Sequence, residues 1–288
     1  MPIEKISDTA RWMAYARSME TERPDALFRD PFARRLAGAH GEAIAGEIGN
    51  AELIARGIAV RTAVMDELIL EAVERDNVDL ILNIGSGLDT RPWRLSLPGA
   101  LRWVDVDLPE ILDYKGSIVD AARATCLYEA QPADIANPGA RARALAHCGQ
   151  ARRALVVTEG LLVYLSPGQV SALARDLSTQ AAFQWWLTDL TGPRALQMLR
   201  RVWGPRLRGA EFQFAPADSA GFFARLGWRE HLFRASGEEA KRLNRSTPTP
   251  LLSRIMLKLA SASFKEEFRR LSGVALLARD RVPVPGAA

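Results

Sequence analysis

Two glycines and a later acid form the clearest chemical pattern in the chain. An apolar run at residues 78–84 ends in Gly85 and Gly87, which are separated by a single residue. The run is rich in leucine and isoleucine and polar mainly at its edges, which is typical of a strand buried on both faces of a parallel sheet. Glycines allow a sharp turn and let a ligand lie close to the backbone. The stretch therefore predicts a nucleotide-type site at the carboxyl ends of the strands of an open α/β sheet.

The residues that follow this loop discriminate between ligands that contain adenosine. A dinucleotide fingerprint needs a third glycine where the chain has Thr90, and no Gly-Lys-Ser or Gly-Lys-Thr follows as in a phosphate-binding loop. A second apolar segment, 101–107, places Asp105 and Asp107 on the same side of a predicted strand. An acid at the end of this strand could accept both hydrogens of a ribose diol. A ligand with adenosine but no phosphates, of which S-adenosylmethionine is the common example, fits best. The alternative is two buried strands with an ordinary glycine turn.

Several blocks of sequence resemble a known family in their order and spacing. They are TARWMAYARSMETERPDALFRDPFARRLAG, GSGLDTRPWRL, VDVDLPEILDYK and TEGLLVYLSPGQ. They are similar to the leucine carboxyl methyltransferase-like family of S-adenosylmethionine-dependent O-methyltransferases. That family includes the protein phosphatase C-terminal methyltransferases and many bacterial small-molecule enzymes. The resemblance covers about residues 7–190, and beyond it only a late Gly-Trp pair and a final apolar strand match.

The resemblance implies a fold, a domain organisation and a cofactor. The fold is the class I methyltransferase fold, a Rossmann-like α/β arrangement with a seven-stranded, mostly parallel sheet and helices on both faces. The cofactor is S-adenosyl-L-methionine, and the product is S-adenosyl-L-homocysteine. We expect an N-terminal helical cap over the cofactor at residues 1–50 and a methyltransferase domain at residues 51–288. Lid elements are expected at about 191–225 and 236–271, the second of which could instead form a dimer surface.

The resemblance also implies roles for individual residues in binding the cofactor. The family has a basic residue in its N-terminal segment and an arginine before the first strand that meet the cofactor's carboxylate, and Arg17 and Arg61 match them. A guanidinium suits this role because it can donate two parallel hydrogen bonds to a carboxylate. In methyltransferases of this architecture an acid after the third strand accepts from the adenine amino group, and the next apolar residue packs on the ring. Asp134 and Ile135 match that pair. A solvated helix face for Arg17 and a turn for Asp134 are the simpler alternatives.

Glu159 and Tyr164 are the candidate residues at the point of methyl transfer. Glu159 ends a predicted strand at the same edge as the glycine loop, and the family has an acid here near the sulfonium or the substrate. The Tyr164 hydroxyl could orient an acceptor, although a buried tyrosine with a satisfied hydroxyl is common. A carboxylate acceptor, with a pKa of about 4, needs no base, whereas a phenol, with a pKa of about 10, usually does. None of the three histidines falls in a recognised motif, which favours a carboxylate or an acidified phenol. Arginines could bind an anionic acceptor, namely Arg91, Arg94 or those at 194–208.

Hydrophobic periodicity predicts the remaining elements. We expect helices at residues 7–22, 32–36 and 51–75, and a Gly/Ala-rich linker or lid at residues 38–51. In the long helix, five residues are placed to face the sheet, namely Leu53, Ile58, Val64, Leu68 and Val73. Later strands are expected at about residues 126–134, 154–160, 183–190, 226–233 and 273–279, the last two as an antiparallel pair.

Composition restricts the class of protein. Apolar residues make up 48% and charged residues 25% of the chain, which favours a folded core over disorder. No apolar run approaches a membrane span and the first residues lack the core of a signal peptide, so we expect a cytoplasmic protein. Cys126 and Cys148 have neither metal-ligand spacing nor partners for a disulfide framework, and we expect no metal site. The net charge of +4 comes from scattered arginines without interleaved aromatic residues, which argues against a nucleic-acid partner.

These patterns together predict an S-adenosylmethionine-dependent O-methyltransferase. The expected acceptor is a carboxylate or phenol oxygen of a small molecule, with bacterial secondary metabolism as one setting. The alternatives are a protein or peptide C-terminal carboxyl methyltransferase and a non-catalytic S-adenosylmethionine-binding protein. Thr90 disfavours an NAD-dependent oxidoreductase. A small-molecule acceptor is the expected partner, with no nucleic acid and no membrane, and a homodimer is left open.

Overall fold

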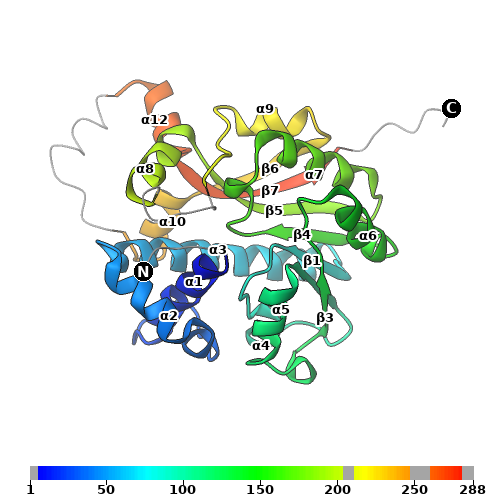
Figure 1. The fold of residues 1–288 in the computed structure, drawn as a ribbon. Coiled ribbons are helices and arrows are strands. Elements are labelled where there is room, and N and C mark those ends of the chain that lie inside the picture. The colour runs from blue at the N-terminus through cyan, green and yellow to red at the C-terminus, as the bar shows by residue number, and fades with distance from the viewer. Residues whose placement is uncertain (1–5, 204–210, 247–259, 281–288) are drawn as a thin grey trace.

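The structure is a computed structural model that describes residues 6–203, 211–246 and 260–280 (Figure 1). Its strands are β1 Leu80–Ile84, β2 Arg102–Asp107, β3 Leu127–Pro132, β4 Ala154–Thr158, β5 Phe183–Thr191, β6 Trp228–Ala235 and β7 Ser272–Arg279. They form one seven-stranded sheet in the order β3-β2-β1-β4-β5-β7-β6. Neighbouring strands are parallel, except that β7 runs antiparallel to both β5 and β6. The predicted strands are therefore present, including the antiparallel pair.

Helices cover both faces of this sheet. The α-helices are α1 Ile6–Thr21, α2 Ala33–Glu47, α3 Ala51–Arg75, α4 Arg91–Arg94, α5 Pro109–Gly116, α6 Pro138–Cys148, α7 Pro167–Thr179, α8 Pro193–Trp203, α9 Ser219–Ala224, α10 Ser236–Arg242 and α12 Ala262–Arg269, and the 3-10 helices are η1 Ala121–Arg123 and η2 Leu162–Tyr164. One apolar core lies between the sheet and α6, α7 and α9, and another lies between the opposite face and α3 (Figure 1). Successive side chains of β1 point to opposite faces of the sheet, so this strand contributes to both cores. Leu80 and Leu82 face the first core, and Ile81 faces the second.

The Gly/Ala-rich stretch at residues 38–51 is not a linker. Helix α2 continues through most of it, with a single kink at Gly38, whose φ is 58°. Gly41 and Ile44 are buried in this helix, and a Cβ atom on Gly41 would lie 2.6 Å from the Arg11 carbonyl oxygen of α1. The small residues therefore allow the backbones of α1 and α2 to approach closely. A composition typical of a flexible loop here reflects close helix packing.

Helix α3 faces the sheet with most of the predicted residues, but not with all of them. Val64 and Leu68 are buried against the sheet, whereas Leu53 is 50% exposed. The first turns of α3 pack instead on α1 and α2, through Ala55 and Ile58. Leu53 lies on a different side of the helix from these two residues. The predicted positions of Leu53 and Ile58 were therefore wrong, because neither faces the sheet.

The insert at residues 236–271 is anchored to the last turn of α1 and to the segment after it. Arg245 is 5% exposed and forms ion pairs with Glu20 and Asp25 at 2.7 and 3.1 Å. Residues 247–259 lie outside the described residues, and so does the Thr-Pro repeat at 247–250. The role of this insert as a lid or as a dimer surface stays a prediction.

Candidate active site

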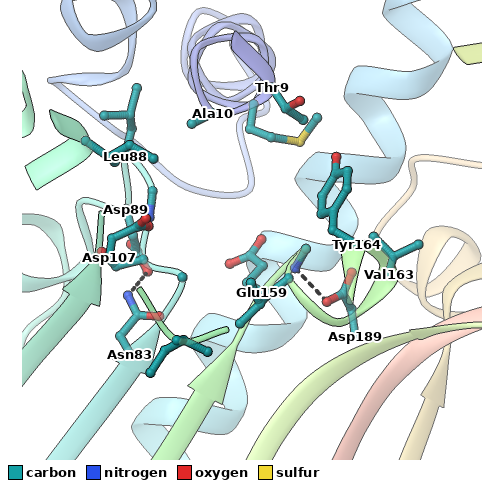
Figure 2. A pocket seen from close by; sticks show the side chains of 18 of the residues that line it. Thr9, Ala10, Asn83, Leu88, Asp89, Asp107, Glu159, Val163, Tyr164 and Asp189 are labelled. Carbon is teal, nitrogen blue, oxygen red and sulfur yellow. Dashed lines mark hydrogen bonds between the residues drawn. The ribbon is translucent and has the colours of Figure 1, made fainter. Parts of the chain in front are cut away.

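A cavity of about 500 Å³ lies at the carboxyl ends of the parallel strands (Figure 2). Its walls come from α1, α3 and the loops that follow β1, β2, β3 and β4, together with the end of β5. Strands β1 and β4 are neighbours, and the chain proceeds outward from them in opposite directions along the sheet. This is the topological switch point, where open α/β sheets bind ligands.

The glycine loop has the conformation that the sequence indicated. Gly85 and Gly87 have φ values of 66° and 51°, in the left-handed region that favours glycine. A Cβ atom on Gly85 would lie 2.9 Å from a methyl group of Leu161. The amide of Gly87 donates to the Asp107 Oδ2 atom at 2.6 Å, so the acid fixes the loop from the next strand.

Asp107 reaches the cavity with acceptor capacity to spare. Its Oδ1 atom accepts from the Leu108 amide at 2.7 Å, and its Oδ2 atom accepts from Gly87. A carboxylate offers about four lone-pair sites, so both oxygens can accept a further hydrogen, as a ribose diol requires. Burial raises the pKa of Asp107 above its ordinary value, because the two amide hydrogen bonds only partly compensate the desolvation.

Two buried hydroxyl groups, one in the glycine loop and one in α3, indicate whether the cavity suits a polar ligand. The Ser86 and Thr62 hydroxyls are buried, and neither has a hydrogen-bond partner among the residues that the structure describes. Both side chains line the cavity. Buried polar groups are normally hydrogen-bonded. Orphaned hydroxyls beside a glycine cradle and the Asp107 carboxylate therefore fit a polar ligand such as the adenosine and amino-acid parts of S-adenosylmethionine.

Asp134 and Ile135 both line the same cavity, beyond β3. The Asp134 carboxylate accepts from the Ala136 amide at 2.9 Å, which also gives it the role of a turn residue. Ile135 is 8% exposed and joins Leu108 and Ile111 on this wall. The arrangement is compatible with an adenine ring against Ile135, and the assignment of this pair stays a prediction.

Arg17 is not on a solvated helix face. It is 9% exposed, and it donates to Asp30 at 2.9 Å and to the Leu88 carbonyl at 2.6 Å. Asp30 also accepts from the Thr90 hydroxyl at 2.7 Å. Burial alone would raise the pKa of Asp30, but Arg17, with smaller contributions from Arg94 and the Thr90 hydroxyl, outweighs it and lowers that pKa. Arg17 thus ties α1 to the glycine loop at the edge of the cavity, and its contact with the cofactor carboxylate stays a prediction.

Arg61 lines the cavity, and two of its three nitrogens donate hydrogen bonds to carboxylates of the protein. Its Nε atom donates to Glu159 at 3.0 Å, and its Nη1 atom donates to Asp189 at 2.9 Å. Within the described chain, the Nη2 atom meets the Met13 sulfur at 3.8 Å, which is a weak acceptor. The predicted ligand role of Arg61 is therefore compatible with the structure through Nη2.

Arg91 and Arg94 form a buried ion-pair cluster in the wall of the cavity. Arg91 donates to Asp66 at 2.6 Å, and to Asp89 and Glu159 at 2.7 Å each. Arg94 donates to both oxygens of Asp66 at 2.6 and 2.8 Å. Both guanidinium groups are committed to internal carboxylates, which argues against the expectation that they bind an anionic acceptor.

Two of the remaining arginines considered for an anionic acceptor, Arg194 and Arg200, have protein partners, whereas Arg201 is exposed. Arg194 pairs with Glu267 at 2.7 Å, and Arg200 donates to the Phe212 carbonyl at 2.8 Å. Residues 204–210, which carry the other arginines of this segment, lie outside the described residues. An anion-binding role for the segment is therefore untested.

Glu159 and Tyr164 line the cavity between the glycine loop and a group of apolar side chains (Figure 2). Burial alone would raise the pKa of Glu159, but Arg91 and Arg61 outweigh it and lower that pKa, so the side chain stays anionic at neutral pH. Burial raises the pKa of Tyr164, which keeps its hydroxyl protonated. The Tyr164 ring lies 5.3 Å from that of Phe212, centroid to centroid.

Asp189 is a position in the cavity wall that the sequence analysis did not identify. It lies near the carboxyl end of β5, lines the cavity and contacts Arg61. The signal was available, because an acid at the end of a predicted strand is the same pattern that singled out Glu159. None of the three histidines, all of which are described, lines the cavity. No metal-ligand cluster and no helix able to span a membrane occurs within the described residues.

Comparison with known families decides the identification. The model of the family described as leucine carboxyl methyltransferase matches residues 10–178. The chain belongs to the leucine carboxyl methyltransferase family. Membership in this family of S-adenosylmethionine-dependent enzymes confirms the predicted methyltransferase and its cofactor.

Relatives of this methyltransferase span most of its length. A protein of Frankia alni named "putative S-adenosyl-L-methionine-dependent methyltransferase" is 32% identical over 263 residues, which cover 84% of this chain and 90% of the relative. A Streptomyces coelicolor protein of the same name is 30% identical and covers 76% of this chain and 82% of the relative.

Solved structures share the fold at low sequence identity. A DUF574 family protein from Streptomyces avermitilis is 13% identical, with a TM-score of 0.60 over 95% of this chain and 97% of the other. A "putative methyltransferase" from Thermobifida fusca is 16% identical, with a TM-score of 0.56 over 93% and 94% of the two chains. The predicted class I, Rossmann-like α/β fold is confirmed.

The raised pKa of Asp107 predicts a pH dependence of cofactor binding. Protonation removes the acceptor that the ribose diol needs, so the affinity for S-adenosylmethionine should fall as the pH is lowered from neutrality toward the pKa of Asp107, which lies above 3.8. Glu159 and Asp30 have lowered pKa values and stay charged over the same range. Calorimetric titration at several pH values measures the effect. The Asp107→Asn variant should bind more weakly at neutral pH and lose this pH dependence, and an unchanged slope in the variant would contradict the assignment.

Proposed function

We propose that the chain transfers a methyl group from S-adenosylmethionine to an oxygen atom of a small molecule. The observation that supports this is one continuous cavity with two differently built parts. The glycine-loop part is polar, and the other part, here called the apolar lobe, is lined by Trp12, Met13, Ile54, Ile58, Val163 and Phe212. Figure 2 shows Glu159 between Asp107 on one side and Tyr164 on the other. The volume of about 500 Å³ lies within the usual range of small-molecule sites.

Each part of the cavity has a task in this reaction. When bound, S-adenosylmethionine supplies an electrophilic methyl group on a positively charged sulfur. Asp107 accepts from the ribose hydroxyls, and Arg61 donates from Nη2 to the carboxylate. Glu159, which is anionic, stabilises the bound cation. This alone does not accelerate transfer, because the charge at sulfur falls in the transition state. The rate comes from aligning the acceptor oxygen in the apolar lobe and from excluding water there.

Helix α1 is the cap of this site in our proposal. Thr9, Ala10, Trp12 and Met13 line the cavity from one turn of that helix, and Arg17 follows on the next turn. The proposed division places this cap at residues 1–50 and the methyltransferase domain at residues 51–288. The cytoplasmic location, the homodimer and the absence of nucleic-acid or membrane partners stay predictions.

The transfer itself is tested with purified protein, S-adenosylmethionine and three classes of acceptor: aromatic carboxylic acids, phenols and a short peptide ending in leucine. Release of S-adenosylhomocysteine is measured, and mass spectrometry locates the methyl group. Alkaline hydrolysis then separates methyl esters, which are cleaved, from methyl ethers, which are not. We expect an O-methylated small molecule, with activity lost in Asp107→Asn and kept in the surface control Asp113→Asn.

Other outcomes would decide against this proposal. Methylation of the peptide alone would favour the alternative C-terminal carboxyl methyltransferase. Micromolar cofactor binding without any product would favour a non-catalytic binding protein. A product methylated on nitrogen or carbon would contradict O-methylation.

A further inference from the structure

We infer that Asp189 receives the proton of the acceptor, and that the acceptor is a weakly acidic hydroxyl group, such as a phenol, on an apolar scaffold. This inference rests on the proposed O-methyl transfer and names the class of its substrate. It revises the expectation that the lack of a histidine base favours a carboxylate or an acidified phenol as the acceptor.

The position of Asp189 suits a proton acceptor. It lines the cavity with 18% of its side chain exposed. Its Oδ1 atom accepts from the Gly160 amide at 2.7 Å, and its Oδ2 atom accepts from Arg61 at 2.9 Å. Two hydrogen bonds leave about two lone-pair sites on the carboxylate for a substrate hydroxyl. Since both oxygens are held, the carboxylate is fixed in orientation before the acceptor arrives.

Asp189 also lies between the transfer point and the apolar lobe. Figure 2 shows it close to Glu159 on one side and to Val163 and Tyr164 on the other. Glu159 shares the Arg61 guanidinium with it. An acceptor whose ring occupies the apolar lobe therefore presents its hydroxyl to Asp189 beside the methyl donor.

The charges of the cavity disfavour a carboxylate acceptor. Within the described residues, five acids line the cavity, namely Asp89, Asp107, Asp134, Glu159 and Asp189. The lining cations are four arginines, each of which forms an ion pair with a carboxylate of the protein, namely Arg17, Arg61, Arg91 and Arg94. The cofactor's own carboxylate already requires one of these guanidinium groups. A second anion would lie beside Glu159 and Asp189, and the only cation left to balance it would be the sulfonium, which already faces Glu159; that arrangement costs free energy. A neutral hydroxyl avoids this cost.

The apolar lobe favours an aromatic carrier of that hydroxyl. Tyr164 and Phe212 present rings 5.3 Å apart, and Met13 and Ile54 add a flexible sulfur and an aliphatic surface. Aromatic rings and methionine sulfur both pack favourably against a further ring. A phenol offers such a ring together with a hydroxyl whose pKa of about 10 makes a base useful.

The proposed step balances as follows. An oxygen lone pair of the acceptor forms the new O–C bond while the C–S bond breaks, and the electron pair of that bond returns to sulfur. The hydroxyl proton passes to Asp189 and later to solvent. The products are the methyl ether and S-adenosylhomocysteine, and no oxidant, reductant or metal takes part.

The test compares acceptors of different acidity in the full chain and in Asp189→Asn. The probes are an alkylphenol, a nitrophenol that is already ionised at the assay pH, and a benzoic acid with the same ring substitution. We expect the unchanged chain to methylate the alkylphenol with the highest kcat/KM, and the nitrophenol and the benzoic acid, which are both anions at the assay pH, with a higher KM. Asp189→Asn should lower kcat/KM by about 10²- to 10⁴-fold for the alkylphenol, which is the usual contribution of a general base. For the nitrophenol the loss should be roughly tenfold or less, as for one altered hydrogen bond. Asp113→Asn, an exposed acid changed in the same way, serves as the control.

Several results would overturn this inference. If Asp189 only positions Arg61, the affinity for S-adenosylmethionine falls in Asp189→Asn and both phenols lose the same factor. Methylation of the benzoic acid in preference to the phenols refutes the hydroxyl acceptor while leaving the proposed O-methyl transfer intact. Absence of cofactor binding by the well-folded unchanged chain removes the proposed function itself, and calorimetry distinguishes that case from the others.

Discussion

An Arg61→Met variant is expected to bind S-adenosylmethionine roughly 30-fold to several thousand-fold more weakly than the unchanged chain. Truncating one partner of a buried, hydrogen-bonded charge pair costs about 2–5 kcal/mol, and each ~1.4 kcal/mol is a factor of ten in affinity. The substitution changes two sets of contacts, of which the first accounts for the expected loss of affinity. The cofactor carboxylate loses its donor, and Glu159 and Asp189 lose the guanidinium that balances them at 3.0 and 2.9 Å.

Two further variants make this result specific. Arg61→Lys keeps the charge, but a single ammonium cannot span both carboxylates and still donate to a ligand, so its affinity should lie between those of Arg61→Met and the unchanged chain. Arg75→Met changes an exposed arginine on the same helix, α3, and should bind normally. Calorimetric titration gives the affinities, and thermal unfolding shows whether each variant is folded. Unchanged affinity in a folded Arg61→Met chain would show that the carboxylate is held elsewhere, with Arg17 as the next residue to change.

The sequence predicted the framework of the site because that framework depends on strand ends. Buried apolar runs locate the strands, and parallel strands bring their carboxyl ends to one edge. The glycine loop, Asp107 and Glu159 each follow such a run directly, so their meeting in one cavity needed no knowledge of side-chain packing. Asp189 obeys the same rule, because it lies near the carboxyl end of β5, so the sequence carries the signal for it as well.

The partners of the buried charges could not be predicted in this way. Arg61 and Asp189 are 128 positions apart, and Arg245 and Glu20 are 225 apart. No periodicity relates residues at such distances, because their contact depends on how the helices and loops are finally packed. The prediction of a linker in the Gly/Ala-rich part of α2 was wrong for a related reason. Local composition there indicated a loop, whereas the packing of α1 on α2 required small residues.

Arg91→Met is expected to destabilise the folded chain by about 3–5 kcal/mol, the usual cost of removing one partner of a buried ion pair. Arg91 is 1% exposed and donates to Asp66, Asp89 and Glu159. Asp66 keeps Arg94 and Glu159 keeps Arg61, but Asp89 loses the guanidinium that most strongly offsets its burial. Urea unfolding of the unchanged chain and the variant measures the difference. Arg152→Met, which removes an exposed pair with Asp79, is the matched control and should cost no more than about 1 kcal/mol.

The pH dependence of this destabilisation distinguishes lost charge pairing from lost packing. Burial alone would raise the pKa of Asp89 and Glu159, but the neighbouring cations outweigh it and lower both in the folded state: Arg91 with Lys115 and Arg94 at Asp89, and Arg91 with Arg61 at Glu159. An acid with a lowered folded pKa contributes stability above its unfolded pKa of about 4, and this stability is lost as the pH falls through the folded value. The unchanged chain has this contribution in full, and Arg91→Met loses the part of it that Arg91 supplies. The difference in the free energy of unfolding should therefore be largest near neutral pH and should shrink as the pH is lowered below about 4. A difference independent of pH would mean that the Arg91 side chain stabilises the site by its packing alone.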